Sequence, residues 1–285
     1  MPIIHNIELK TKKGGFIYRA IIAFLAIGAV VQFLPLFWMI VGTFKTDLEL
    51  IQAVPKVFPA NWSVAAYADA FAKYKIWENI WNTVILCVSI ILLQVSNSAL
   101  SAYALSKMRP RFGKQIFLII IGTMMFSSVA LMFPLYIMVA QMGLIGSKMA
   151  LILSSGAWAY SIFLFKSFFD SIPSELMESA KIDGASDMRI FGTVILPLSK
   201  PVFAVNILNT FMAVYNDFAY PLMLLPDKKD WTIMIRLFNI EKMGAAVQPS
   251  LLYVLMVVAT LPVLIIYLFA QKNIVEGIST TGIKG

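Results

Sequence analysis

The stretch AIIAFLAIGAVVQFLPLFWMIVGTF, Ala20–Phe44, carries no charged residue and decides the fold class. A helix of about 20 apolar residues crosses the ~30 Å hydrocarbon core of a bilayer, so this stretch is long enough to span a membrane. Its apolar run also exceeds the roughly 7–15 residues of a signal-peptide core. We therefore expect it to stay in the protein as the first transmembrane helix.

Further apolar stretches of similar length follow along the chain, and Asp217 is the one charge that interrupts the fifth span. The sequence predicts an all-α integral membrane protein with six transmembrane helices, forming a single transmembrane domain over residues 1–285. The predicted spans are residues 20–43, 82–106, 116–142, 149–169, 201–225 and 250–271.

The overall composition supports the same fold class. Hydrophobic residues make up 60% of the chain and charged residues only 13%, whereas a soluble domain has roughly a quarter of its residues charged. The net charge of +8 could indicate nucleic acid, but no aromatic-interleaved basic patch of the kind that binds single strands is present. Positive charge in a membrane protein instead collects in cytoplasmic loops. We therefore expect lipid, and no nucleic acid, as the chain's surroundings.

The basic residues also predict the orientation of the spans. Short cytoplasmic loops are enriched in Lys and Arg, and the loop from Lys107 to Lys114 is both short and basic, as is the N-terminal tail. With six spans, both chain ends fall on the side that carries these charges. The sequence predicts cytoplasmic N- and C-termini.

The segment between the fourth and fifth spans, residues 170–200, predicts a helix–glycine–helix elbow on the cytoplasmic side. Ser174 is placed to cap a first helix, and Glu175 suits the positive end of its dipole. The helix would run to Asp183, after which Gly184 can adopt the left-handed conformation that ends a helix. A second short helix would begin near Ser186.

Two interpretations of this elbow follow from its pattern of apolar residues. Leu176, Ala180, Ile182 and Ala185 give an apolar strip with charged residues along its margin. Such a short exposed helix suits docking into a groove on a partner protein. It equally suits an amphipathic helix that lies on the membrane surface. The periodicity alone does not choose between them.

A resemblance favours the docking interpretation. The segment Glu178-Ser-Ala-x-x-Asp183-Gly184-Ala185, followed by Phe191 and by Val194-Ile-Leu-Pro197, resembles the EAA loop of permease subunits of ATP-binding-cassette importers. Ser179 replaces the usual first alanine, a small change. In that family the loop is the coupling helix seated on the ATPase. The resemblance therefore implies ATPase-coupling roles for Glu175, Glu178, Ala180, Asp183, Gly184, Ala185, Phe191 and Pro197.

Further motifs extend the resemblance over nearly the whole chain, to the carbohydrate-uptake permeases of the maltose type. They are Pro35-Leu-Phe-Trp-Met39, Ala102-Tyr-Ala-Leu105, Pro134-Leu-Tyr136, Asn216-Asp-Phe218 and the C-terminal Gly282-Ile-Lys-Gly285. The resemblance implies a bacterial cytoplasmic membrane protein that imports a sugar or oligosaccharide by alternating access. It implies a second, different permease subunit, two copies of an ATPase and an extracellular or periplasmic solute-binding protein as partners.

The chain lacks the residues that would let it hydrolyse ATP itself. A phosphate loop needs the pattern G-x-x-x-x-G-K-[ST], and the pair Gly113-Lys114 is followed by Gln115. ATP and Mg²⁺ are therefore expected on the partner ATPase, and no cofactor or metal on this chain. His5 and Cys87 are the only His and Cys residues, and we predict neither a catalytic residue nor a metal ligand among them.

Polar residues inside the predicted spans mark a candidate substrate pathway. Polar groups in lipid face the interior of the helix bundle, where they find partners, and an ionisable residue there is a candidate functional residue. Helix-to-helix hydrogen bonding explains Ser98, Ser101 and Thr210 better. The predicted pathway residues are Gln94, Asn97, Asn209, Tyr215, Asn216 and Asp217. Amides, one carboxylate and nearby aromatic rings suit an uncharged, hydroxyl-rich ligand.

Other classes of protein fit the sequence less well. An ion-coupled secondary transporter usually carries paired intramembrane ionisable residues and internal repeats, whereas this chain offers Asp217 and no visible repeat. A membrane-embedded enzyme would need a catalytic constellation that the chain does not show. An importer of a non-sugar polar solute stays open as an alternative.

Overall fold

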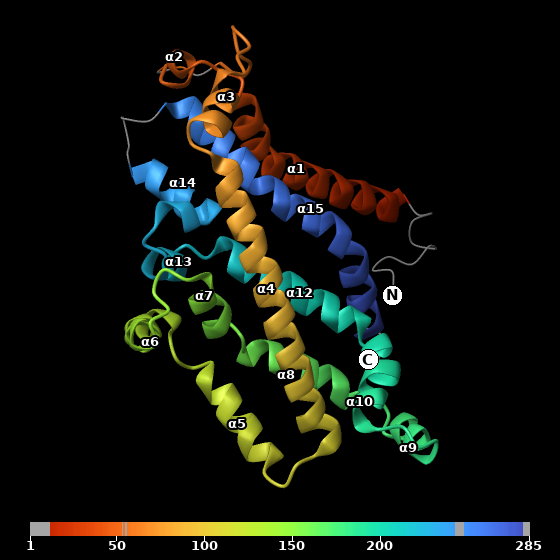
Figure 1. Cartoon of the computed structure of the whole chain (residues 1–285). Coiled ribbons are helices and arrows are strands. Elements are labelled where there is room, and N and C mark those ends of the chain that lie inside the picture. The colour runs from red at the N-terminus through yellow and green to blue at the C-terminus, as the bar shows by residue number, and fades with distance from the viewer. Residues whose placement is uncertain (1–11, 53, 55, 243–247, 282–285) are drawn as a thin grey trace. The chain divides into compact units, whose positions relative to one another are not determined.

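The computed structural model describes residues 12–52, 54, 56–242 and 248–281 of the chain. The described residues are helical and contain no strand, which agrees with the predicted all-α class (Figure 1). The predicted C-terminal motif at 282–285, and His5, lie outside the described residues. The elements are α1 (Lys12–Gly42), α2 (Asp47–Leu50), α3 (Ala65–Ala72), α4 (Ile76–Tyr103), the π-helix η2 (Ala104–Met108), α5 (Gly113–Thr123), α6 (Ser128–Gln141), α7 (Lys148–Ser154), α8 (Ala159–Asp170), α9 (Glu175–Ile182), α10 (Asp187–Ile190), the π-helix η3 (Phe191–Ile195), α11 (Leu196–Leu198), α12 (Lys200–Asn216), α13 (Ala219–Leu224), the 3-10 turn η4 (Lys228–Asp230), α14 (Ile233–Lys242) and α15 (Pro249–Thr281).

The chain divides into two compact units. The first comprises residues 1–74 and 244–257, and the second comprises residues 75–243 and 258–285. Helix α15 contributes its first turns to the first unit and the rest of its length to the second. The single transmembrane domain over residues 1–285 stays a prediction.

The first unit is fastened by polar contacts around the end of α1 and the start of α15. Gly42 ends α1 so close to the ring of Tyr253 that a Cβ there would lie 2.5 Å from it. Asp47 Oδ1 accepts hydrogen bonds from the backbone N–H and the hydroxyl of Ser250, at 3.0 and 2.7 Å. Glu49 accepts the N–H groups of Thr46, Ala60 and Asn61. These contacts hold the loop that follows α1.

The charge of Lys45 is satisfied inside this unit without a carboxylate. Its side chain is buried, and the Nζ donates to the carbonyl of Lys56 at 2.6 Å. The same Nζ lies 4.1 Å from the ring centroid of Trp38, a cation–π geometry. The pKa of the neighbouring Glu49 carboxyl lies below its usual value. Desolvation raises this pKa, but hydrogen bonds from three backbone N–H groups and the charge of Lys45 together lower it by more than desolvation raises it.

The second unit is built on α4, which packs side by side with α8 and α12 (Figure 1). An apolar cluster joins these helices to α9 and α10, with Phe165 and Phe169 fully buried at its centre. A second cluster joins α4 to α6, α7 and α13 through Leu86, Leu151 and Leu224. The chain between Phe169 and Val202 therefore belongs to the same core as the long helices.

Buried polar pairs hold these three helices together. The hydroxyl of Ser161 on α8 donates to Asn206 Oδ1 on α12 at 2.7 Å. Gln94 on α4 donates to the hydroxyl of Thr210 on α12 at 3.3 Å. Hydrogen bonding between helices therefore explains Thr210, as expected. Ser98 differs, because its buried hydroxyl has no hydrogen-bond partner.

Within the described residues, three helices are individually long and apolar enough to cross a membrane: Gly15–Gly42, Ile76–Met108 and Pro249–Leu268. Three further pairs of helices satisfy the same criteria only when each bent pair counts as one span. They are α5 with α6 at 101°, α7 with α8 at 42°, and Asp187–Leu198 with α12 at 83°. Up to six spans result. Each of the predicted spans 116–142 and 149–169 is divided between two helices in the structure, and the spans themselves stay predictions.

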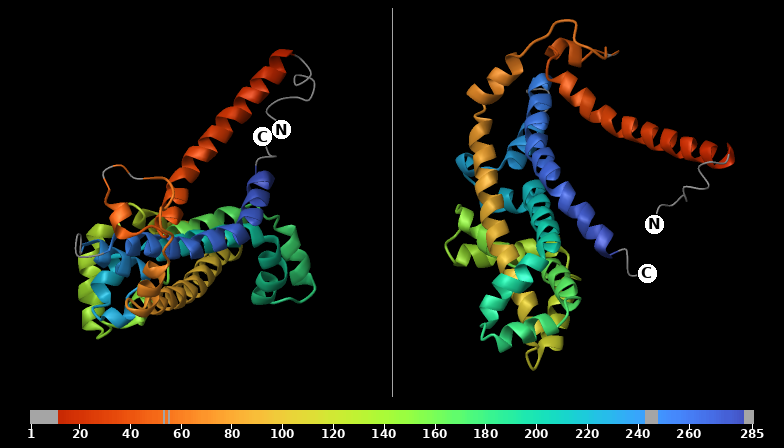
Figure 2. Two further views of the ribbon diagram at one scale, coloured as in Figure 1. Left: turned by 90° about the horizontal axis from the view of Figure 1, so that it is seen from above. Right: turned by 90° about the vertical axis from the view of Figure 1, so that its right-hand side faces the viewer.

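The elbow between α8 and α12 has the predicted helix–glycine–helix form. Helix α9 ends at Ile182, and Gly184 has a φ of +77°, in the left-handed region. Helix α10 begins after Ser186, whose hydroxyl accepts the N–H of Arg189. Figure 2 shows this elbow projecting from one end of the second unit.

Two details of the predicted elbow are wrong. Ser174 precedes α9, but its side chain makes no capping hydrogen bond. The apolar residues also do not form one strip: Ala180 and Ala185 pack against the core, while Ile182 is 86% exposed. The buried anchor of α9 is Met177. Ala180 and Ile182 are two residues apart on α9, so the helix carries them on different faces, and Ala185 lies beyond the break at Gly184.

Candidate functional site

A cavity of about 550 Å³ lies in the second unit. Helices α4, α12 and α13 and the break between α7 and α8 contribute to its wall. The lining residues are Gln94, Ser128, Ser155, Ala157, Trp158, Met212, Ala213, Val214, Asn216, Asp217 and Tyr220. This volume falls in the range of small-molecule sites, and its lining combines aromatic rings with amide and hydroxyl groups.

Three of the predicted pathway residues meet at this cavity: Gln94 from α4, and Asn216 and Asp217 from the end of α12. Asn216 donates to the carbonyl of Met212 one turn earlier. Asp217 lies where α12 ends and α13 begins, so the fifth predicted span is interrupted at this carboxylate. Asp217 is the only charged group among the residues that line the cavity.

The other three predicted pathway residues lie elsewhere. Asn97 donates to the carbonyl of Gly156 at 2.9 Å and so ties α4 to the break between α7 and α8. Tyr215 is buried, and its hydroxyl donates to the carbonyl of Ala259 at 2.7 Å. Asn209 is half-buried on α12 and does not line the cavity. The polar stripe read from the spacing therefore divides between the cavity and contacts between helices.

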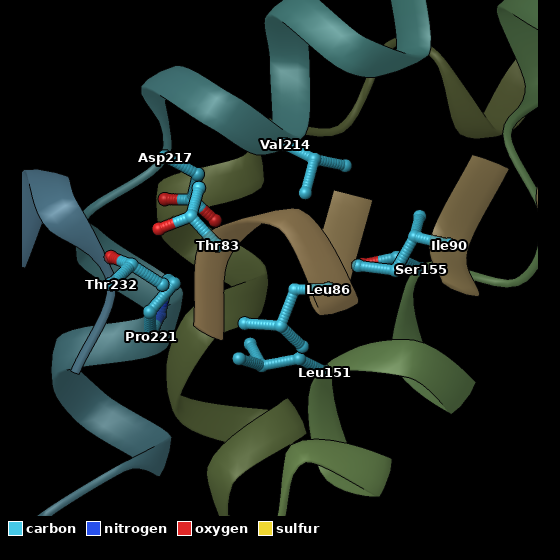
Figure 3. A pocket seen from close by; sticks show the side chains of 9 residues that line it. All are labelled: Thr83, Leu86, Ile90, Leu151, Ser155, Val214, Asp217, Pro221 and Thr232. Carbon is cyan, nitrogen blue, oxygen red and sulfur yellow. The ribbon is translucent and has the colours of Figure 1, made fainter. Parts of the chain in front are cut away.

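Asp217 also borders a second, much smaller cavity of about 20 Å³, large enough for one water molecule (Figure 3). In Figure 3 its carboxylate lies beside Thr83, while Leu86, Ile90 and Leu151 form the apolar side. Thr83 donates to the carbonyl of Asn79 and accepts the N–H of Ile233. Asp217 thus stands between a water-sized space and the large cavity.

A local structural role for Asp217 is visible in its hydrogen bonds. Its Oδ1 accepts the backbone N–H groups of Ala219 and Tyr220, at 3.0 and 3.3 Å. These are first-turn donors of α13, which have no partner within the helix itself. Asp217 therefore fixes the start of α13, and Tyr220 in turn donates its hydroxyl to the carbonyl of Ser128.

This role gives a prediction for two substitutions. Asp217→Ala removes the acceptor and should lower the free energy of unfolding by about 1 kcal/mol, the usual cost of losing a helix cap. Asp217→Asn keeps an oxygen at the same place and should stay close to the wild type in thermal unfolding of the purified protein. If Asp217→Asn loses as much stability as Asp217→Ala, the capping role is wrong.

The elbow offers the other candidate surface. Ile182, Met188 and Leu176 are 86%, 65% and 45% exposed, which gives the elbow apolar side chains that no other part of the described chain covers. The predicted coupling residues divide between its two sides. Glu175, Glu178, Asp183, Gly184 and Pro197 are exposed, whereas Ala180, Ala185 and Phe191 are half-buried against the core. Lys181 pairs with Asp187 at 3.1 Å and closes the elbow.

No metal site is visible in the part of the chain that the structure describes, where no three His, Cys, Asp or Glu side chains are grouped to hold an ion. Cys87 is buried as a free thiol on α4. The side chains at the cavity offer amide, hydroxyl and aromatic groups for hydrogen bonding and ring contacts with a ligand.

Comparison with known proteins identifies the family. Residues 94–280 match the family described as the binding-protein-dependent transport system inner membrane component. The chain belongs to this family. The matched segment includes the cavity helices α12 and α13 and the whole elbow. Membership makes the chain a multi-pass permease of the cytoplasmic membrane and implies that it works with an ATPase and a solute-binding protein.

Curated relatives narrow the group within the family. The polygalacturonan/rhamnogalacturonan transport system permease protein YtcP of Bacillus subtilis is 32% identical, over 93% of this chain and 97% of its own. The galactooligosaccharides transport system permease protein GanQ of the same organism is 31% identical, over 92% of this chain and 93% of its own. The chain is thus a carbohydrate-uptake permease of the ATP-binding-cassette type, a transport subunit and not an enzyme.

A solved structure shows the same fold. A bacterial ABC transporter involved in the import of the acidic polysaccharide alginate contains a chain with a TM-score of 0.82 to this permease. The two chains are 22% identical in sequence, and the matched region covers 92% of this chain and 98% of the alginate-transporter chain. This likeness agrees with the helical membrane fold predicted from the sequence.

Several cavity residues were not predicted from the sequence. Trp158, Ser155 and Ser128 line the cavity, and they lie at breaks between helices within the predicted spans. Gly156 gave a partial signal. It is followed by two residues before α8 begins, and a Cβ on it would lie 2.9 Å from Leu93 Cδ2, so a larger residue there needs the Leu93 side chain to shift. Gly28, however, lies within the unbroken helix α1, so a glycine inside an apolar run does not by itself mark a break.

Proposed function

We propose that this permease moves a neutral oligosaccharide across the cytoplasmic membrane by alternating access. In this proposal a separate ATPase binds the elbow and drives the transport. The observation that carries the proposal is the exposed apolar surface of the elbow, with Ile182 86% exposed on a segment whose interior side shares the core of α4, α8 and α12. A partner seated there could move these helices.

The ATPase supplies the energy in this scheme. Two ATPase copies bind ATP with Mg²⁺, and their closure moves the coupling elbow of this chain and that of a second, different permease subunit. The attached helices tilt and open the cavity to the outside, where a solute-binding protein delivers the ligand. Hydrolysis reverses the movement. The chain ends and the loop Lys107–Lys114 lie on the cytoplasmic side in this orientation.

The chemistry of the cavity favours an uncharged sugar. Amide and hydroxyl groups of Gln94, Asn216 and Tyr220 can hydrogen-bond to sugar hydroxyls, and Trp158 offers a ring face for stacking. Asp217 would repel a carboxylate on an acidic sugar. The relatives named above serve both acidic and neutral saccharides, so their names leave this choice open.

Uptake into proteoliposomes tests the proposal. The permease is purified with its partners, reconstituted with ATP inside, and offered a panel of labelled saccharides that includes galactobiose, maltotriose, raffinose and oligogalacturonate. We expect ATP-dependent accumulation of a neutral member. Accumulation of oligogalacturonate alone would contradict the neutral class, and accumulation of a non-sugar polar solute would favour the alternative importer. Accumulation by this chain without any ATPase would overturn the proposal.

A further inference from the structure

The C-terminal end of α4 and the π-helix η2 contact the elbow at two places, just before α9 and at the start of α10. Tyr103 donates its hydroxyl to the carbonyl of Asp187, at the start of α10, at 3.1 Å. Lys107 Nζ donates to the carbonyl of Ile172, just before α9, at 2.6 Å. We use "α4 clamp" for the three residues Tyr103, Ser106 and Lys107. The clamp thus holds the chain on both sides of α9, although α4 is not joined to the elbow in sequence.

Ser106 reinforces the attachment that Lys107 makes just before α9. Its hydroxyl donates to Asp170 Oδ1 at 2.6 Å, and Lys166 pairs with Asp170 Oδ2 at 2.7 Å. Asp170 is the last residue of α8, where helix carbonyls lack partners and a positive charge is favourable. Lys107 satisfies one carbonyl of this region. The exit from α8 into the elbow is therefore fixed to α4 by charge-assisted hydrogen bonds, which are the stronger kind.

Buried side chains reinforce the clamp. Tyr103 is 5% exposed, and its ring lies 5.2 Å from the ring of Phe191 at the start of η3. Ala102 and Tyr103 share one apolar cluster with Met177 of α9 and Ile190 of α10. Close-packed interiors transmit displacement, because neighbouring side chains leave no free space. A movement of either half of the elbow therefore displaces the end of α4.

The local geometry of α4 supports a specialised role for this end. The helix changes to a π-helix over residues 104–108, which carries Ser106 and Lys107. A π-turn inserts one residue into the helical register and is frequently found at functional sites. The segment Phe191–Ile195, against which Tyr103 packs, is also a π-helix. One π-helix therefore follows Tyr103 directly, and the other begins at Phe191, whose ring contacts Tyr103.

We propose that Tyr103 and Lys107 are positioning residues that fasten α4 to the elbow as one rigid body. This inference rests on the proposed function, in which the ATPase moves the elbow. Helix α4 brings Gln94 to the large cavity, and near its outer end Asn79 and Asn82 donate to the carbonyl of Trp231. The clamp therefore transmits the ATPase-driven movement of the elbow to α4, which runs from the elbow to the cavity and on to Trp231.

Spin labels test the rigid body without knowledge of the transported solute. The only cysteine is removed by Cys87→Ala, and labels are placed by Ser179→Cys on α9 and Glu78→Cys near the outer end of α4. The distance between the labels is measured in the complete transporter, first without nucleotide and then with ATP and vanadate. We expect the wild-type distance to change by less than about 3 Å, roughly half a helical turn.

The variant Tyr103→Phe/Lys107→Met removes both attachments. Without nucleotide it should match the wild type, but ATP with vanadate should shift its distance by more than about 3 Å or broaden the distribution. If the two contacts only stabilised the fold, their loss would not make the distance between the labels change on addition of nucleotide. The single variant Lys107→Arg keeps a cationic donor at this position. The distance between its labels should therefore be as insensitive to nucleotide as the wild-type distance. Tyr136→Phe on α6 is the matched loss of a tyrosine hydroxyl and should change nothing. Lys107→Met alone serves if the double variant fails to assemble.

Two outcomes would overturn the clamp: a nucleotide-dependent shift above this limit in the wild type, or a double variant as rigid as the wild type. Failure of the proposed function itself is detected separately, by the ADP that vanadate traps in the purified complex. If no nucleotide is trapped because no ATPase accompanies this chain, the proposed function is wrong.

Discussion

Replacing Gly184 by valine is expected to uncouple ATP hydrolysis from solute uptake. Gly184 has a φ of +77°, which costs an L-residue roughly 1–2 kcal/mol and a β-branched residue more. No atom lies within 4 Å of the position that a Cβ would occupy, so the effect comes from the backbone and not from a clash. The turn should open and displace α9 from α10. Solute accumulated per ATP hydrolysed should fall about tenfold or more, as 1.4 kcal/mol corresponds to a factor of ten.

Two control variants separate this effect from general damage. Gly184→Asn should keep most of the coupling, because asparagine tolerates the left-handed region. Gly122→Val introduces the same side chain at a helical glycine that also has open space around its Cβ position, so it should couple normally. Normal uptake by Gly184→Val would show that the angle of the elbow does not matter for coupling.

Phe165→Ala should give the largest loss of stability. Phe165 is fully buried on α8, and its ring lies 4.6 Å from Phe203 and 5.6 Å from Phe169. Removing such a side chain leaves a cavity and costs about 3–5 kcal/mol. The lost contacts join α8 to α12 beside the elbow. Thermal unfolding of the purified protein in detergent should show a markedly lower midpoint.

The matched control for this substitution lies two residues away. Phe163 is on the same helix but is 38% exposed, so Phe163→Ala should change the unfolding midpoint far less. Equal losses for both variants would mean that α8 is not packed as described, and would weaken the link between the elbow and the long helices.

Apolar runs predicted the fold class because membrane-crossing length depends on local composition. The run around Ala20 and the one that contains Cys87 are single helices in the structure, as such runs require. The runs that contain Phe126 and Gly156 are broken, because backbone groups at a break find partners from other helices. Asn97, for example, donates to the carbonyl of Gly156. Partners distant in sequence are invisible to a periodicity argument.

The candidate site, like the fold, was predictable from the sequence only in part. Gly184 was predictable from residue type, since few residues tolerate its conformation, and its φ is positive as expected. Gln94 and Asp217 were found as polar groups inside apolar runs, and they do line the cavity. Tyr215 shows the limit of such reasoning, because its hydroxyl is satisfied by the carbonyl of Ala259. Spacing identifies the face of a helix but not the partner that satisfies each side chain.

Photo-cross-linking from the elbow is the most direct test of whether the elbow binds the ATPase subunit. A photoreactive amino acid replaces Ile182, which is 86% exposed on α9, in cells that express the whole transporter. The same amino acid at Met125, which is 89% exposed at the break between α5 and α6, is the control. We predict a product between Ile182 and the nucleotide-hydrolysing subunit, with none from Met125. An Ile182 probe that captures lipid alone, in a transporter that still hydrolyses ATP and accumulates solute, would contradict the account.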